Sequence, residues 1–152
     1  MKSCGTVKRS KRQGQAVVEF ALVLPIFMLL LFGGIELGIV YFRIHLLTNA
    51  AREGARVGSM PNSTESEVDA AVNDFLNAAG IDTDTCNVVV HVYPPGETVP
   101  GGNARAGGLS DAQQGDRIYV RVEHNFEVVT GTLIPGVSGT LNLHSTCVFR
   151  HE

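Results

Sequence analysis

The chain has 152 residues, 44% of them hydrophobic, and a formal net charge of −3, and this length provides for one modest domain plus an anchor. The charge is unevenly divided: residues 1–14 carry +5 and no acid, whereas the remainder carries −8 and no lysine. Because the positive charge is confined to a short tail, the composition argues against a nucleic-acid-binding protein.

Residues 1–14 are expected to form a basic cytoplasmic leader in front of a single membrane span. The segment from Phe20 to Phe42 contains Glu36 as its only charge. As a helix at about 1.5 Å per residue it would be about 35 Å long, enough to cross a bilayer. The basic tail predicts a cytoplasmic N-terminus and an exported part from residue 43 to residue 152. Ordinary signal cleavage is disfavoured, because the apolar stretch is too long and no A-x-A site follows it promptly.

The helical pattern continues beyond the span, which predicts one long helix over residues 15–59. Pro25 lies inside it and is expected to kink it. Small residues recur at four-residue spacing, a pattern that lets another helix approach closely: Gly34 and Gly38 in the span, then Ala50, Gly54 and Gly58 outside it. For the first pair, the abundance of glycine in membrane helices is an equal explanation. Glycine in a water-exposed helix costs about 1 kcal/mol, so the second set predicts a packing surface for the protein's own globular part or for a neighbouring subunit.

Residues 60–152 read as a small α+β domain. A capping-box pattern at Thr64 and Glu67 begins a second helix, which Gly80 ends. Period-two alternation then predicts three strands, over Cys86–Tyr93, Asp116–His124 and Thr140–Arg150, with Phe126 to Val129 either extending the second strand or forming a short crossing segment. Residues 94–115 are rich in glycine and proline and predict an exposed, flexible loop. The fold class is therefore a long transmembrane helix that continues outside the membrane, plus one helix packed on about three antiparallel strands.

No constellation of residues carries chemistry. The histidines at positions 45, 91, 124, 144 and 151 lack metal-ligand spacing and are expected at the surface. The segment "IDTDTC" lacks the glycine and the distal glutamate of a calcium loop, and no serine lies in a nucleophile-elbow pattern. We therefore expect no catalytic site, metal or cofactor. Cys86 and Cys147 both lie in the exported part, where a disulfide and two buried free thiols are equally compatible with the sequence.

The junction between Gly14 and Gln15 separates the basic tail from the apolar run. If the chain were cut there, Glu19 would become the fifth residue of a new N-terminus and Phe20 the sixth. A carboxylate in lipid costs about 2.5–3.5 kcal/mol near the centre of the bilayer and less near its edge. Pairing of Glu19 with the new α-amine of a neighbouring subunit would offset that cost and set the register between subunits. A side chain that snorkels to the interface explains Glu19 equally well.

The stretch "RQGQAVVEFALVLPIFMLLLFGGIELGIVYFRIHLLTNAAREGAR" resembles the N-terminal region of TadE-like proteins, the minor pilin-like (pseudopilin) components of the tight adherence, or Flp, pilus system. The resemblance covers residues 12–56 and combines a basic tail, Gly14, Glu19-Phe20, Pro25 and "AAREGAR". The ending "STCVFRHE" is also similar to the way these chains close. Major pilins of this system are very short and typically carry Glu-Tyr in place of Glu19-Phe20, so this chain looks like a minor component.

The resemblance implies a pilin-like fold and removal of the leader by a prepilin peptidase, which leaves Gln15 as the mature N-terminus. Glu19 would act as the pilin fifth-position glutamate in assembly and processing. The implied partners are the peptidase, the major Flp-type pilin, other pseudopilins, inner-membrane platform proteins, an assembly ATPase and membrane lipid. The implied location is the bacterial inner membrane, or the pilus and cell surface after assembly.

The expected function is that of a minor pseudopilin in pilus assembly, adherence or secretion. The alternative is a membrane-anchored periplasmic scaffold or binding module that is not incorporated in a filament. A membrane-tethered hydrolase is disfavoured, because no nucleophile, base or metal cluster is visible.

Overall fold

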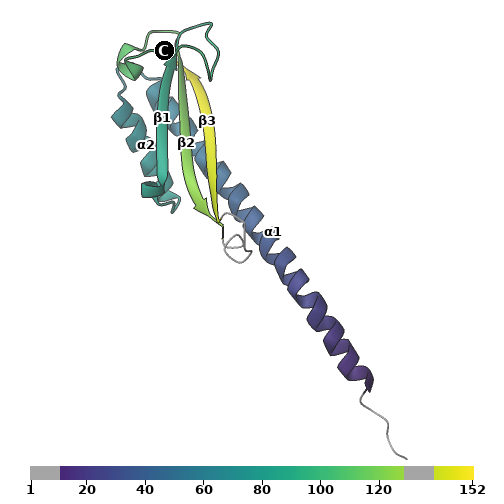
Figure 1. Ribbon diagram of the computed structural model, residues 1–152. Helices are drawn as coiled ribbons and strands as arrows, with labels where there is room; N and C mark the ends of the chain where they lie inside the picture. The colour runs from purple at the N-terminus through teal and green to yellow at the C-terminus, as the bar shows by residue number, and fades with distance from the viewer. Residues whose placement is uncertain (1–10, 129–138) are drawn as a thin grey trace, which may run out of the picture.

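A long helix projects from a small globular part in the computed structural model of the chain, which describes residues 11–128 and 139–152 (Figure 1). The elements in chain order are α1 (Lys11–Gly58), α2 (Glu65–Ala78), the short 3-10 helix η1 (Thr83–Thr85), β1 (Cys86–Tyr93), a second one η2 (Gly108–Asp111), β2 (Arg117–Glu127) and β3 (Thr140–Arg150). The expected α+β class is confirmed. Most of the basic leader, residues 1–10, lies outside the described residues, as do residues 129–138 between β2 and β3.

Helix α2 begins and ends where the local sequence indicates. The Thr64 side chain accepts a hydrogen bond from the Glu67 backbone N–H at 3.3 Å, and the Glu67 carboxylate accepts one from the Thr64 N–H at 2.9 Å. This capping box satisfies two of the amide groups that a helix start leaves unpaired. Beyond the last turn, Gly80 has a φ of +74°, a left-handed conformation that glycine adopts without strain.

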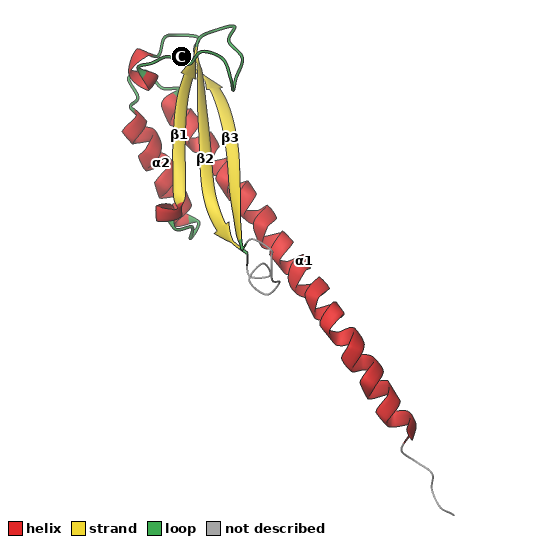
Figure 2. Ribbon diagram, viewed as in Figure 1, coloured by secondary structure: helices red, strands yellow, loops and turns green. Residues whose placement is uncertain are grey.

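The three strands form one antiparallel sheet in the order β1-β2-β3 (Figure 2). Alternate residues of the central strand, Ile118, Val120 and Val122, are fully buried. Strand β2 does not end at His124 but continues to Glu127, with Phe126 opposite Leu141 on β3. The extension of the second strand is therefore the correct alternative for this segment, as far as Glu127.

The core lies between the helices and one face of the sheet. The outer half of α1 contributes Leu47, Ala50, Ala51 and Ala55, each with no exposed surface. Helix α2 contributes Val68, Val72 and Leu76 along one side. The last turns of α1 pass behind the sheet, and the apolar N-terminal half of the helix extends away from it (Figure 1). The globular part is thus completed by the helix that carries it.

The other face of the sheet is partly covered by the loop over residues 94–115. Tyr93 and Tyr119 point away from the helices, yet each is only 5% exposed, and their rings meet edge to face with centroids 6.2 Å apart. The loop is attached to the sheet by a hydrogen bond from the Arg105 N–H to the Val92 carbonyl at 2.8 Å. In η2, Leu109 is buried in the core. The expected exposed loop therefore has fixed attachments, and its flexibility stays a prediction.

Candidate functional site

The N-terminal turns of α1 hold the four residues of the expected cleavage and assembly site. Gly14, Gln15, Glu19 and Phe20 follow one another on a continuous helix and are all exposed. Apart from its chain neighbours and the backbone of its own helix, no atom of the described residues lies within 4 Å of the place where a Cβ would stand on Gly14. The helix runs unbroken from Lys11 through the Gly14–Gln15 bond. A protease binds its substrate as an extended backbone, so cleavage at this bond would require the helix to unwind locally. Glycine makes unwinding easier, because it lowers helix stability by about 1 kcal/mol relative to alanine.

The apolar half of α1 leaves its large side chains bare. Val17, Leu30 and Phe42 are 67%, 68% and 62% exposed, and most of the large apolar residues between them are also exposed. This is the one helix in the described ranges, 11–128 and 139–152, that is long and apolar enough to cross a membrane. So much apolar surface, at about 25 cal/mol per Å² of transfer free energy, requires lipid or other helices around it. The chain is thereby suited to membrane anchoring.

Pro25, Gly34 and Gly38 lie within this bare half. The helix continues through Pro25 without a break. Apart from neighbouring residues of the helix itself, no atom in the described ranges lies within 4 Å of a Cβ placed on Gly34 or Gly38. The structure therefore gives this pair no packing partner within the part of the chain that it describes, and both explanations of the pair stay open.

The second set of small residues packs against the protein's own globular part. A Cβ on Gly54 would lie 2.6 Å from Val72 Cγ2 of α2 and 3.4 Å from Val120 Cγ1 of β2. A Cβ on Gly58 would lie 3.0 Å from Ile118 Cγ2. With Ala50 fully buried, the set forms the seam along which α1 meets α2 and the sheet. Of the two alternatives from the sequence, the internal one is correct.

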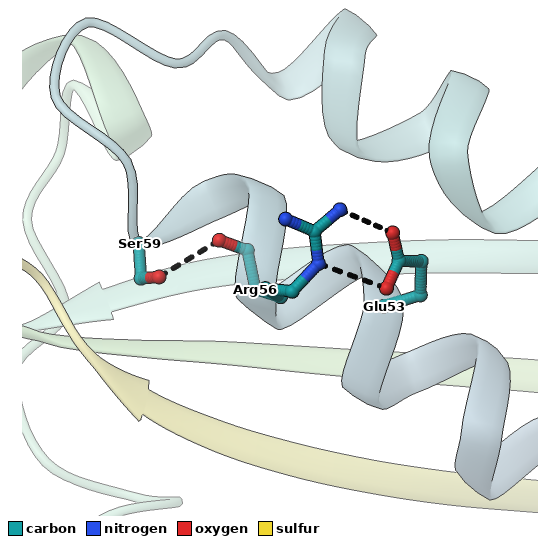
Figure 3. A network of polar contacts seen from close by, with 3 residues as sticks. All are labelled: Glu53, Arg56 and Ser59. Carbon is teal, nitrogen blue, oxygen red and sulfur yellow. Dashed lines mark hydrogen bonds and ion pairs between the residues drawn. The ribbon is translucent and has the colours of Figure 1, made fainter.

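The segment "AAREGAR" divides into two faces of α1. Ala50, Ala51, Gly54 and Ala55 point inward, whereas the charged residues point outward. On the outward face, Arg56 contacts the Glu53 carboxylate through two nitrogen atoms at 2.5 and 3.0 Å, and this bonding lowers the pKa of Glu53 (Figure 3). The Ser59 hydroxyl donates to the Arg56 carbonyl at 2.8 Å and closes the helix end (Figure 3). The motif therefore encodes both the seam and the end of α1.

Where α1 leaves the globular part, a buried histidine contradicts the expectation of surface histidines. His124 is 4% exposed, and its Nε2 atom accepts a hydrogen bond from Arg43 Nη1 at 3.4 Å. Arg43 also stacks over the Phe126 ring, 4.7 Å from its centroid. The ring proton is then on Nδ1, which is buried and has no hydrogen-bond partner among the described residues. Burial, with the Arg43 charge, lowers the pKa of His124.

His151 is a second buried histidine, 8% exposed, at the opposite end of the domain. Its backbone N–H donates to the Asp116 carbonyl at 2.8 Å. The Asp116 carboxylate accepts from Arg105 at 2.5 and 3.0 Å and from the Gln113 N–H at 2.8 Å. Burial alone would raise the pKa of Asp116, but these bonds and the positive charge of Arg105 outweigh it and lower that pKa. The cluster ties the loop of residues 94–115 to the C-terminal end of β3.

The hypothesised disulfide between Cys86 and Cys147 is not formed, because β2 separates the two strands that carry them. Both cysteines are free and half-buried. Cys86 is opposite His124 on β2, whereas Cys147 is opposite Val120, four residues away. With strands about 4.8 Å apart and about 3.4 Å per residue, the two Cα atoms are separated by about 17 Å, against the 4.4–6.8 Å that a disulfide needs. Burial raises the pKa of each thiol.

The predicted site residues therefore form two groups, not one. The junction residues near Glu19 and the seam around Gly54 lie on the same helix, separated by about 50 Å at 1.5 Å per residue. Sequence reasoning did not identify Arg43, His124 or Phe126 as a contact. The alternation that places Val120 and Val122 inward also places His124 inward, within the predicted strand Asp116–His124, and it places Phe126 inward once that strand is extended.

The family model for TadE-like proteins matches residues 14–56, which confirms the resemblance seen in the sequence. The matched segment begins at the expected junction and ends within the seam, so it covers the bare half of α1 and most of its packed half. No curated protein and no solved structure matches the chain. The match indicates a component associated with the Tad pilus.

Proposed function

We propose that this chain is a minor pseudopilin of a Tad/Flp-type pilus that acts in pilus assembly, adherence or secretion. One observation carries the proposal: a single helix combines a bare apolar half with a half that completes the exported domain, and residues 14–56, spanning both halves, match TadE-like proteins. The role is assembly rather than catalysis. Helix α1 would hold the folded domain at a fixed distance outside the membrane.

The same bare surface serves two states of the protein. In the bacterial inner membrane, Phe20 to Phe42 would contact lipid, with the N-terminus cytoplasmic and residues 43–152 exported. In an assembled pilus, the apolar helices of neighbouring subunits would replace the lipid. Because acyl chains and apolar side chains solvate such a helix about equally, the exchange between the two states costs little.

Glu19 would supply a charge pair between neighbouring subunits in the assembled state. After cleavage at Gly14, the new α-amine of Gln15 carries a positive charge four residues away from Glu19 along the chain. An offset neighbour can place its own amine beside Glu19, and the pair fixes the axial register. The prepilin peptidase, the major pilin, other pseudopilins, the platform proteins and the assembly ATPase are the partners of this pathway.

Intact mass and N-terminal sequencing test the processing step. The full chain is produced in membranes with and without a co-expressed prepilin peptidase. We expect the peptidase to yield a chain beginning at Gln15. Gly14→Leu is expected to remain uncut, whereas the control Gly33→Leu is expected to be cut normally, since an added side chain would meet no neighbouring group at either position but only Gly14 lies at the junction. A wild-type chain that still begins at Met1 beside an active peptidase contradicts the proposal.

A second experiment separates a pseudopilin from a scaffold that stays in the membrane. Surface filaments are sheared from cells and compared with the membrane fraction by immunoblot. We expect the chain in both fractions, with Glu19→Ala present in membranes and lost from filaments. Detection of the processed chain only in membranes contradicts incorporation.

A further inference from the structure

Strand β3 is an unpaired edge of the sheet. It spans 11 residues and pairs on one side only, with β2. In the described ranges, no hydrogen bond joins its outer side to other backbone. Exposed edges are usually protected by proline, lysine, inward charges or a bulge, since they otherwise pair with other chains. Residues 140–150 contain no proline, lysine or acidic residue, so this edge is left open to a further strand.

Apolar side chains at both ends of β3 are not covered by the domain. Leu141, Val148 and Phe149 are 43%, 44% and 40% exposed. Near the middle of the strand, α1 does contact it, through a 2.8 Å hydrogen bond between Thr48 Oγ1 and Ser145 Oγ, and Leu143 is buried. The helix therefore covers the centre of β3 and leaves apolar surface at its ends, on both faces of the sheet.

Two arginines beside this edge, Arg52 and Arg150, have no acidic partner among the described residues. Arg56, Arg105 and Arg121 each pair with a carboxylate. Arg52 on α1 is exposed, and its charge acts on the Cys147 thiol of β3 from the helix side. Arg150 is exposed at the C-terminal end of β3 and lies on the other face of the sheet. Neither has an ion pair in the part of the chain that the structure describes, although the chain after residue 14 is strongly acidic.

A second copy of this chain does not fit the edge symmetrically. Two β3 strands joined antiparallel about a two-fold axis would direct their α1 helices in opposite directions. Both copies could not then be anchored in one membrane with their exported parts on the same side, a step that rests on the anchoring in the proposed function. An antiparallel pair of copies is therefore excluded, and the positive charges of Arg52 and Arg150 beside the edge favour an acidic segment of a different polypeptide.

We propose that β3 accepts an extended, acidic segment of another protein as a fourth strand of the sheet. Main-chain hydrogen bonds along the edge would supply affinity. Alternate apolar residues of the segment would cover Val148 on one face and Phe149 on the other, and its carboxylates would pair with Arg52 and Arg150. The exported domain thus acts as a receptor for a strand, in addition to its place on the helix.

Site-specific photocrosslinking in the producing bacterium tests this proposal. A photoreactive residue replaces Val148 in the full chain, and the crosslinked peptide is identified by mass spectrometry. A control position, Asn87, lies on β1 at the opposite edge. We expect Val148 to crosslink to an acidic segment of a different protein and Asn87 to give no such product. Products that join only two copies of this chain, or no product from Val148 in cells that form pili, overturn the proposal.

Charge substitution supplies a second, independent measurement. The double variant Arg52→Glu/Arg150→Glu is expected to reduce the Val148 crosslink at least fivefold, whereas Arg52→Lys/Arg150→Lys retains it. Asn77→Glu, on the exposed side of α2, adds acid elsewhere and should leave the yield unchanged. Equal resistance to limited proteolysis shows that each variant is folded. A crosslink that is indifferent to the charge reversal overturns the acidic recognition.

Failure of this inference is distinguishable from failure of the proposed function. Membrane fractionation and the N-terminal mass of the same samples report anchoring and processing. A processed, membrane-anchored chain without a β3 crosslink rejects only the strand partner. An unprocessed chain that still crosslinks at Val148 rejects only the pseudopilin role.

Discussion

Gly38 and Gly54 look equivalent in the sequence but have different surroundings. Both lie on α1 in a repeat of small residues at four-residue spacing. Gly38 has open space where a Cβ would stand, whereas a Cβ on Gly54 would lie 2.6 Å from Val72 and 3.3 Å from Val68. Valine is stiff about its Cα–Cβ bond, so Val72 cannot easily turn away. The absence of a side chain at position 54 is what lets α2 lie against α1.

Gly54→Ala is expected to destabilise the exported part by about 1–2 kcal/mol. Overpacking costs about 1–3 kcal/mol, and the better helix propensity of alanine returns up to about 1 kcal/mol. Urea unfolding of the full chain in detergent, followed by circular dichroism, measures the change. Gly38→Ala is the matched control and should not change the unfolding of the exported part. A Gly54→Ala chain as stable as the wild type would contradict the close seam.

His124 is expected to make the folded chain less stable as the pH falls. Arg43 faces it from α1, Asp82 lies before η1, and Cys86 is its partner on β1. Burial and the Arg43 charge lower the pKa of His124 in the folded chain, so the unfolded chain binds a proton first as pH falls. The free energy of unfolding should therefore fall as pH drops below about 6.5, the ordinary histidine value, and level off below the folded pKa.

The measurement is urea unfolding between pH 8 and pH 5, with two variants. His124→Leu should flatten the decline, because leucine has no proton to bind. The exposed His91→Leu serves as the control and should keep the decline of the wild type. An unchanged pH profile for His124→Leu would refute the assignment to this residue.

Helix α1 is continuous, but its two halves have different surroundings. Its first half has the composition of a membrane span and buries nothing in the described chain, whereas its second half supplies a seam of small residues and the Glu53–Arg56 pair. The contacts that each strand makes likewise depend on which strands lie beside it. Strand β2 lies between β1 and β3, and this order decides which side chains can meet.

Oxidation is expected to leave Cys86 and Cys147 unjoined within one chain. Their separation of about 17 Å across β2 exceeds the reach of a disulfide. Mass spectrometry after mild oxidation and alkylation of the full chain should find both thiols alkylated. Val120→Cys provides the positive control, because position 120 is the direct partner of Cys147 on the neighbouring strand and should give a disulfide. An intramolecular Cys86–Cys147 bond in the native chain would contradict the strand order.

In the whole molecule, the globular part and the outer half of helix α1 form one folding unit. The core is closed by Leu47, Ala50, Ala51 and Ala55 from α1, each with no exposed surface. One helix on a three-stranded sheet would otherwise expose its apolar face to water.

A chain that begins at residue 43 is expected to fold, whereas a chain that begins at residue 60 is not. The longer fragment keeps the seam and both helices of the core, and the shorter one leaves Val68, Val72 and Leu76 without their contacts. Cooperative urea unfolding, monitored by circular dichroism, distinguishes them. A cooperative transition for residues 60–152 alone would show that the domain does not need α1.

Local patterns in the sequence predict the main helices and strands of this protein. The apolar run, the capping box at Thr64 and the period-two strands are local patterns, and the helix, α2, β1 and β3 follow them within a few residues. The tertiary structure alone decided which surfaces meet: that Gly54 packs on Val72, that Cys86 and Cys147 are kept apart, that His124 is buried and that β3 is an open edge. The physical reason is that strand order and helix packing arise from contacts between residues far apart in the chain, to which local periodicity is indifferent.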